Sequence, residues 1–132
     1  RSTELGITDR VVFHGWLPQE ERDTLLAQAW VLVFPSVKEG WGLVVTEAGT
    51  FGVPTVAYRK AGGVAESIEH GLTGLLVDSE DELVDAVRRV LRDSDLRTTL
   101  GAAARKKALS RTWESASAEM AALIGQLIQR SP

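Results

Sequence analysis

The sequence predicts an α/β fold in which helices cover both faces of a parallel β-sheet. Apolar runs of strand length alternate with segments of helical periodicity through residues 1–78, and neighbouring parallel strands need helical crossovers of this kind. The apolar runs are continuous, as expected of strands that are buried on both faces. From residue 79 onward the pattern is helical throughout. We therefore predict one domain of three layers, with a βα core in residues 1–78 and C-terminal helices in residues 79–132.

The individual elements follow from the apolar runs and from the residues that bound them. Pro18 suits the first turn of a helix, Gly52 is a natural helix stop, and Ser79 followed by three acidic residues suits a helix start. The predicted strands are residues 11–13, 31–34, 54–58 and 75–77, and the predicted helices are 19–29, 43–51, 63–69, 79–91, 96–109 and 113–128.

The start of the chain predicts a Rossmann-like domain that is truncated on its N-terminal side. Residues Ser2 to Arg10 resemble the tail of an earlier helix and its connection, and the chain has no initiator methionine. A βαβ unit of roughly 30 residues would normally precede this point. Its absence would expose a sheet edge or an apolar face, so we expect the isolated chain to dimerise.

Composition excludes several classes of function. The formal net charge of -3, without a basic stripe, argues against nucleic acid as the main partner. The chain has no cysteine, so disulfides and thiolate chemistry are excluded. It has no apolar run of the ~20 residues that a membrane helix needs, and no signal peptide at the N-terminus. We therefore expect a cytoplasmic protein.

The segment from Ser36 to Ala48 carries the chemistry. It follows a predicted strand and leads into a predicted helix, and ligands of open parallel sheets bind beyond the carboxyl ends of the strands. Gly40 and Gly42 allow the backbone to approach a ligand closely. The free N–H groups of Leu43 and Val44, at the positive end of the helix dipole, suit a diphosphate.

Two glutamates flank this phosphate site, and they need a separate explanation because carboxylates repel phosphates. A carboxylate accepts hydrogen bonds from a pair of neighbouring hydroxyls. Glu39 in the loop and Glu47 in the helix can therefore hold a sugar on one side and a ribose on the other. The alternative is that Glu39 is solvated and Glu47 is a surface acid of the helix.

These residues resemble the retaining glycosyltransferases of the GT-B fold, especially glycosyltransferase family 4 (group 1), in their C-terminal donor-binding domain. Glu39 and Glu47 frame the E-x7-E pattern of that family. Further motifs match in order: Phe13-His14-Gly15, Phe34-Pro35-Ser36, Glu39-Gly40-Trp41-Gly42-Leu43, Glu47-Ala48, Gly52-Val53-Pro54, Ala61-Gly62-Gly63, Glu66 and Gly71-Leu72-Thr73-Gly74. The resemblance covers nearly the whole chain, and it implies that the chain is one part of a GT-B fold.

The resemblance implies a role for each matching residue. Glu39 hydrogen-bonds hydroxyls of the donor hexose as a positioning residue, and Glu47 holds the ribose of the nucleotide. The backbone of Gly40, Trp41, Gly42, Leu43 and Val44 faces the transferred sugar and the diphosphate. The loop Gly15-Trp16-Leu17-Pro18 lines the nucleobase. Trp41 stands where phenylalanine is usual, which preserves an aromatic side chain.

The same resemblance implies a hexosyltransferase that uses a nucleoside diphosphate sugar, needs no metal or other cofactor, and retains the anomeric configuration. Relatives carry an early arginine and lysine that neutralise the leaving diphosphate, and Lys38, Arg59 and Lys60 do not stand in matching positions. That pair and the acceptor domain would belong to a longer chain. We therefore expect this fragment to be inactive alone.

Several features keep alternative interpretations open. A glycogen- or sucrose-synthase-type enzyme or a phosphorylase of the same fold is one alternative, and a non-enzymatic module that binds proteins is another. His14 and His70 stand alone and predict structural or solvent roles. Gly62-Gly63 either touches the donor or starts a helix.

Two surface features of the C-terminal helices also have more than one interpretation. Arg105-Lys106-Lys107 predicts a solvated helix face, with peripheral contact to the anionic inner face of a membrane as the second interpretation. In the GT-B glycosyltransferases that this chain resembles, the last helix crosses to the N-terminal domain. Met120, Leu123 and Leu127 are therefore expected to be exposed here.

Overall fold

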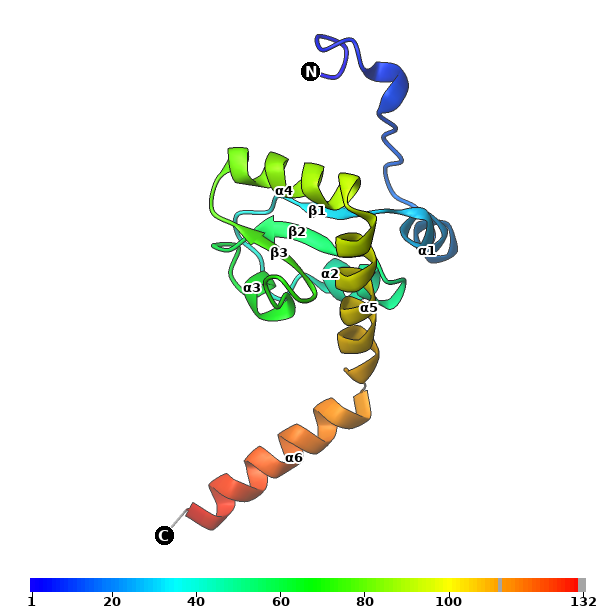
Figure 1. Cartoon of the computed structure of the whole chain (residues 1–132). Coiled ribbons are helices and arrows are strands. Elements are labelled where there is room, and N and C mark those ends of the chain that lie inside the picture. Colours follow the sequence, from blue (N-terminus) through cyan, green and yellow to red (C-terminus); the bar gives the residue numbers. More distant parts are fainter. Residues whose placement is uncertain (112, 131–132) are drawn as a thin grey trace.

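The computed structural model describes residues 1–111 and 113–130, without the side chains of residues 113, 115, 127, 129 and 130. These described residues form a 3-10 helix η1, six α-helices and three strands (Figure 1). These elements are η1 (Thr8–Arg10), α1 (Gln19–Gln28), β1 (Leu32–Phe34), α2 (Leu43–Thr50), β2 (Thr55–Tyr58), α3 (Val64–Ser67), β3 (Gly74–Val77), α4 (Glu80–Arg92), α5 (Ser94–Ser110) and α6 (Trp113–Arg130).

The three strands form one parallel sheet in the order β1-β2-β3. Leu32 pairs with Thr55 and Val56 pairs with Leu75, so the strands begin at the same level and their carboxyl ends share one edge. Helices connect consecutive strands, as parallel pairing requires. The predicted α/β, Rossmann-like architecture with a parallel sheet is therefore confirmed.

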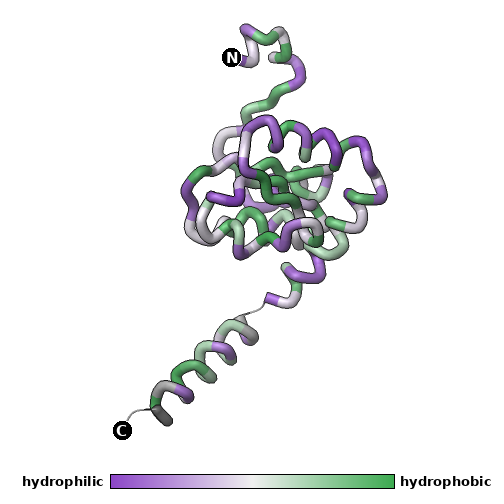
Figure 2. Tube along the Cα trace, turned by 60° about the vertical axis from the view of Figure 1, so that its left-hand side comes forward, coloured by the Kyte–Doolittle hydropathy of each residue, from purple (hydrophilic) through white to green (hydrophobic). Residues whose placement is uncertain are grey.

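Strand residues alternate between two apolar clusters, one on each face of the sheet. Ala57 and Leu76 point toward α2 and α3, where they join Val45 and Val64. The other face carries Val56, Leu75 and Val77, which pack with Leu83 and Val90 of α4 and Leu100 of α5. Figure 2 shows these hydrophobic strands at the centre of the body. Burial on both faces explains the continuous apolar runs of β2 and β3, whereas β1 is only partly buried.

Side-chain caps set where the C-terminal helices begin. The Ser79 hydroxyl accepts a hydrogen bond from the N–H of Glu82, at 3.2 Å, at the start of α4. The Asp93 carboxylate accepts one from the N–H of Leu96, at 2.9 Å, so α5 begins at Ser94, two residues earlier than predicted. Caps of this kind satisfy backbone donors that the first turn leaves free.

The predicted strand at residues 11–13 is wrong. Val12 and Phe13 are 71% and 83% exposed, and the segment leaves the body as an extended connection (Figure 1). Within the described parts of the chain no strand lies beside it, and an apolar run cannot form a strand without a hydrogen-bonding neighbour. Residues 2–10 form hydrogen-bonded turns and η1 rather than the tail of an α-helix.

Helix α6 stands away from the body at the other end of the chain (Figures 1 and 2). Met120 and Leu123 are exposed, as the sequence predicts, and the side chain of Leu127 lies outside the described residues. Neither α6 nor any other described helix combines the length and the apolarity needed to cross a membrane.

Candidate functional site

The loops that follow β1 and β2 lie against each other at the carboxyl edge of the sheet. Glu39 forms an isolated parallel bridge with Gly62, and the N–H of Gly63 donates to the Glu39 carbonyl at 3.4 Å. A Cβ at position 63 would overlap the carbonyl oxygen of Gly40. Gly63 is also the N-cap residue of α3, as the helix-start interpretation predicts, and the glycine pair lets two backbones meet without side chains between them, which the sequence did not predict.

Gly42 makes the turn from this loop into α2. It is buried and has a φ of 68°, a left-handed conformation that favours glycine. The N–H of Val45 donates to the Gly42 carbonyl at 2.9 Å, so the N–H groups of Leu43 and Val44 precede the hydrogen-bonded turns of the helix. These groups, together with the helix dipole, create a local preference for an anion at the carboxyl edge of the sheet.

Glu39 is exposed beside this helix start. The Ser36 hydroxyl lies 3.4 Å from one carboxylate oxygen of Glu39 and 3.4 Å from the carbonyl of Lys38, which accepts from the same hydroxyl. The remaining acceptor sites of the Glu39 carboxylate face solvent, where hydroxyls of a ligand could donate to them.

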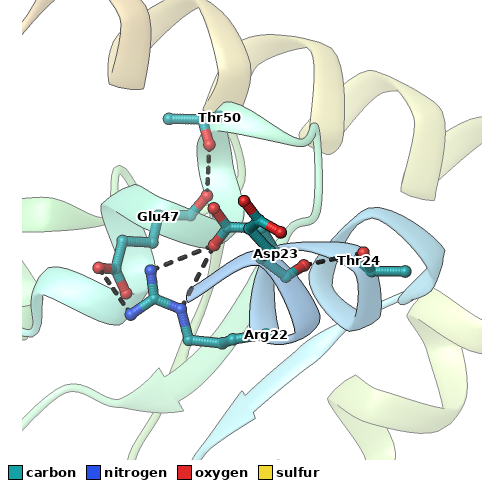
Figure 3. A network of polar contacts seen from close by, with 6 residues as sticks. Arg22, Asp23, Thr24, Glu47 and Thr50 are labelled. Carbon is teal, nitrogen blue, oxygen red and sulfur yellow. Dashed lines mark hydrogen bonds and ion pairs between the residues drawn. The ribbon is translucent and has the colours of Figure 1, made fainter. Parts of the chain in front are cut away.

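Glu47 faces a different neighbour, helix α1. Its Oε1 lies 3.2 Å from Nη1 of Arg22, and the same guanidinium contacts the Asp23 carboxylate at 3.1 Å (Figure 3). The Thr50 hydroxyl donates to the carbonyl of Glu47 at 2.7 Å. The two glutamates therefore contact different parts of the chain, Glu39 the loop after β2 and Glu47 the helix before β1.

The loop Gly15-Trp16-Leu17-Pro18 leads directly into α1. Trp16 is 86% exposed, and the carbonyl of Pro18 accepts from the N–H of Arg22 at 3.1 Å. The end of this loop therefore lies one helical turn from the residue that contacts Glu47. The sequence analysis did not predict the contact of Arg22 with Glu47. Nothing in the local pattern of α1 indicates a contact with a helix that begins 15 residues further along the chain.

Trp41 faces the end of α5, a contact that the sequence also missed. The Arg111 guanidinium lies 4.5 Å from the centre of the Trp41 ring. Lys107 makes an ion pair with Glu69 at 2.9 Å, and its side chain is only 18% exposed. A groove of about 730 Å³ runs between these residues and the start of α6.

Two further expectations concern the basic and histidine side chains. Lys107 is largely covered, so the interpretation of Arg105-Lys106-Lys107 as a uniformly solvated face is wrong for that residue. His70 has a structural role, as expected, because its Nδ1 accepts from the N–H of Leu76 at 3.0 Å. In the described part of the chain no three His, Asp or Glu side chains gather closely enough to hold a metal ion.

A parallel sheet with a glycine-rich strand-to-helix loop at its carboxyl edge defines a Rossmann-like layer. Sucrose-phosphate synthase from Thermosynechococcus elongatus is similar, with a TM-score of 0.83 and 33% identity over 98% of this chain and 33% of that one. HepE of Anabaena, solved with UDP and glucose, is similar with a TM-score of 0.81 and 29% identity, over 95% of this chain and 34% of that one.

Sequence relatives agree with the structural ones. D-inositol 3-phosphate glycosyltransferase of Corynebacterium diphtheriae is 37% identical over 92% of this chain, and the enzyme of that name from Streptomyces coelicolor is 39% identical over 97%. The chain spans only 29% and 28% of the lengths of these two relatives. The family model described as glycosyl transferases group 1 matches residues 1–107, so the chain belongs to this family. The predicted family is confirmed.

Proposed function

We propose that the chain is the donor-binding part of a glycosyltransferase that moves a hexose from a nucleoside diphosphate sugar to an acceptor hydroxyl, with retention at the anomeric carbon. One observation carries the proposal: the loop after β1 ends in a left-handed Gly42 that presents the start of α2 at the carboxyl edge of the sheet. Family membership and the similarity to a structure holding UDP and glucose support it.

Each part of the donor has a matching chemical group in this proposal. The diphosphate accepts hydrogen bonds from the N–H groups of Leu43 and Val44. Glu39 accepts from hydroxyls of the hexose, where its carboxylate is exposed beside Gly40. Glu47 accepts from the ribose, and the loop of residues 15–18 covers the nucleobase. Glu39 positions the sugar here, and the two-carboxylate chemistry of glycoside hydrolysis is not required.

Turnover would need more positive charge near the diphosphate than these loops supply. Stabilisation of a leaving group's developing charge is a large part of catalysis in general. Arg59, which lies close in sequence to the loop after β2, pairs with Asp78 at 3.3 Å and donates to the carbonyl of Leu76 at 3.2 Å. We therefore propose that the 132-residue chain binds a donor without transferring its sugar. Full activity would then require residues outside this chain.

Titration of the chain with UDP, GDP and their hexose conjugates tests the proposal, with backbone amide NMR shifts as a readout that detects weak binding. We expect the amides of residues 39–44 to move and the Glu47→Gln variant to lose affinity. Asp95→Asn, which changes a carboxylate to an amide in the first turn of α5, is the control and should bind as the parent does. Nucleotide binding that Glu47→Gln leaves unchanged would instead favour a non-enzymatic module.

A further inference from the structure

The contact between Arg22 and Glu47 joins two helices that meet at the proposed nucleotide. Arg22 lies in the first turn of α1, and its Nη1 is 3.2 Å from Oε1 of Glu47. Its Nε and Nη2 lie 3.3 and 3.1 Å from Oδ1 of Asp23, so one guanidinium bridges two carboxylates (Figure 3). The side chains of Arg22 and Glu47 are 39% and 36% exposed, which places the contact at the surface but partly shielded from water.

Helix α1 has little else to hold it in place. No residue of α1 is buried, so apolar packing does not fix the helix against the body. Directly after it, Trp30 lies 4.3 Å from the Arg97 guanidinium, a second contact that involves a cation. The position of α1 therefore depends strongly on polar contacts, and the contact between Arg22 and Glu47 is the one that faces the site.

Arg22 also touches the segment that precedes α1. Its N–H donates to the carbonyl of Pro18 at 3.1 Å, and Pro18 ends the loop proposed to line the nucleobase. This bond is an ordinary i→i−4 bond of the helix start, so the side chain of Arg22 acts on the base loop only through the position of α1.

The charge of Arg22 suits this place. A carboxylate beside a diphosphate is repelled by it, and an arginine within 3.2 Å of the carboxylate offsets that repulsion. Arg22 occupies one oxygen of Glu47, whereas a carboxylate offers two oxygens and about four acceptor sites. The other oxygen is therefore available to hydroxyls of a ribose while the arginine holds the side chain in one orientation.

We infer that Arg22 is a positioning residue of the donor site, which orients the Glu47 carboxylate toward the ribose and fixes the base loop relative to it. This inference rests on the proposed function of Glu47. Arg22 makes no contact with the reacting atoms, so its effect on a donor passes through Glu47 and α1.

A double-mutant cycle on the chain tests the inference, with NMR titration by UDP and by 2′,3′-dideoxy-UDP, which lacks both ribose hydroxyls. Arg22→Ala should weaken UDP binding by about two- to fivefold, the range expected for a partly exposed ion pair. It should change the affinity for the dideoxy nucleotide much less, because that ligand cannot use Glu47. Arg22→Lys should restore part of the loss, since it keeps the charge but not the planar fork.

In the Glu47→Gln background, Arg22→Ala should have little additional effect, because both changes remove the same interaction. Arg88→Ala breaks an exposed ion pair with Asp85 in α4 and is the matched control, expected to leave both affinities unchanged. The amide spectrum of each variant reports whether the fold is retained.

The outcomes separate this inference from the function on which it rests. If Glu47→Gln does not weaken UDP or GDP binding, or if neither nucleotide binds, the proposed role of Glu47 is wrong and the inference fails with it. If Glu47→Gln weakens binding but Arg22→Ala leaves it unchanged, Arg22 does not position the carboxylate, and if Arg22→Ala tightens binding, Arg22 competes with the ribose; either result overturns only the inference. Equal losses for UDP and the dideoxy nucleotide would assign Arg22 a purely structural role.

Discussion

Replacement of Gly63 by alanine tests whether the two loops at the carboxyl edge must be in backbone contact. Gly63 has φ -61° and ψ -12°, a conformation that alanine adopts without strain. The obstacle is space: a Cβ there would overlap the carbonyl oxygen of Gly40 and lie 2.7 Å from its carbonyl carbon and 3.3 Å from Cα of Trp41. All three are backbone atoms, so no rotamer change relieves the overlap and the loop of residues 38–41 must move.

Two opposing effects determine how much Gly63→Ala changes the free energy of unfolding. Gly→Ala at a compatible backbone conformation stabilises by about 0.4–1 kcal/mol, because it restricts the unfolded chain. Overpacking a tight contact costs about 1–3 kcal/mol, and the steric term dominates because rigid backbone atoms are involved. We expect Gly63→Ala to lower the free energy of unfolding by about 1–2 kcal/mol, as measured by urea denaturation.

The same displacement should affect donor binding selectively. Moving the loop shifts Glu39 and Gly40, proposed to contact the hexose, while Glu47 keeps its place in α2. Affinity for UDP-glucose should therefore fall by on the order of tenfold, since misplacement by about an ångström has large effects on bound geometry. Affinity for UDP should fall less.

Gly125→Ala in α6 is the control for this change, because a Cβ there meets no atom within 4 Å. It should leave stability equal or slightly increased. A Gly63→Ala protein that unfolds at the same urea concentration as the parent, and that binds UDP-glucose as tightly, would refute the claim that the backbone approach is needed.

Three further substitutions test other parts of the structure. Ser79→Ala removes the cap of α4, whose hydroxyl accepts from Glu82, and should cost about 1 kcal/mol in urea denaturation; no change would mean that solvent replaces the cap. Leu100→Ala, at a fully buried side chain, should cost about 2–5 kcal/mol in the same measurement, and a smaller loss would indicate that the core collapses around the gap. Arg111→Ala removes the cation over Trp41 and should cost about 0.5–1 kcal/mol, a loss that should disappear in a Trp41→Leu background.

The fold was predictable where burial leaves a local signature. The apolar runs that became β2 and β3 are covered on both faces, so their composition identifies them, whereas β1 is only partly covered and Val33 is 39% exposed. Residues 11–13 have the same composition and are not a strand. Composition records a preference for extended backbone, whereas pairing depends on a neighbour that the local sequence does not specify.

The backbone geometry of the proposed site was predictable to a similar degree. The loop into α2 could be predicted because a strand, two glycines and a helix follow one another within a few residues. The contacts of Glu47 with Arg22 and of Trp41 with Arg111 could not be predicted, because each depends on how a separate helix packs against the rest of the domain. For the same reason the sequence did not predict the packing of Gly63 against the Gly40 carbonyl.

The three parts of the proposed site are supported with unequal strength. Helix α2 is anchored by Val45 and Ala48, which are buried against the sheet and α5, so the phosphate end of the site belongs to the core. The loop of residues 38–41, proposed to bind the sugar, is held by backbone contact with Gly62 and Gly63, which contributes little apolar burial. The base end depends on α1, which has no buried residue. Because local stability follows buried contacts, such an arrangement would hold the diphosphate rigidly and let the base loop adjust. The contact between Arg22 and Glu47 would limit this adjustment, since it joins α1 at the base end of the proposed site to α2.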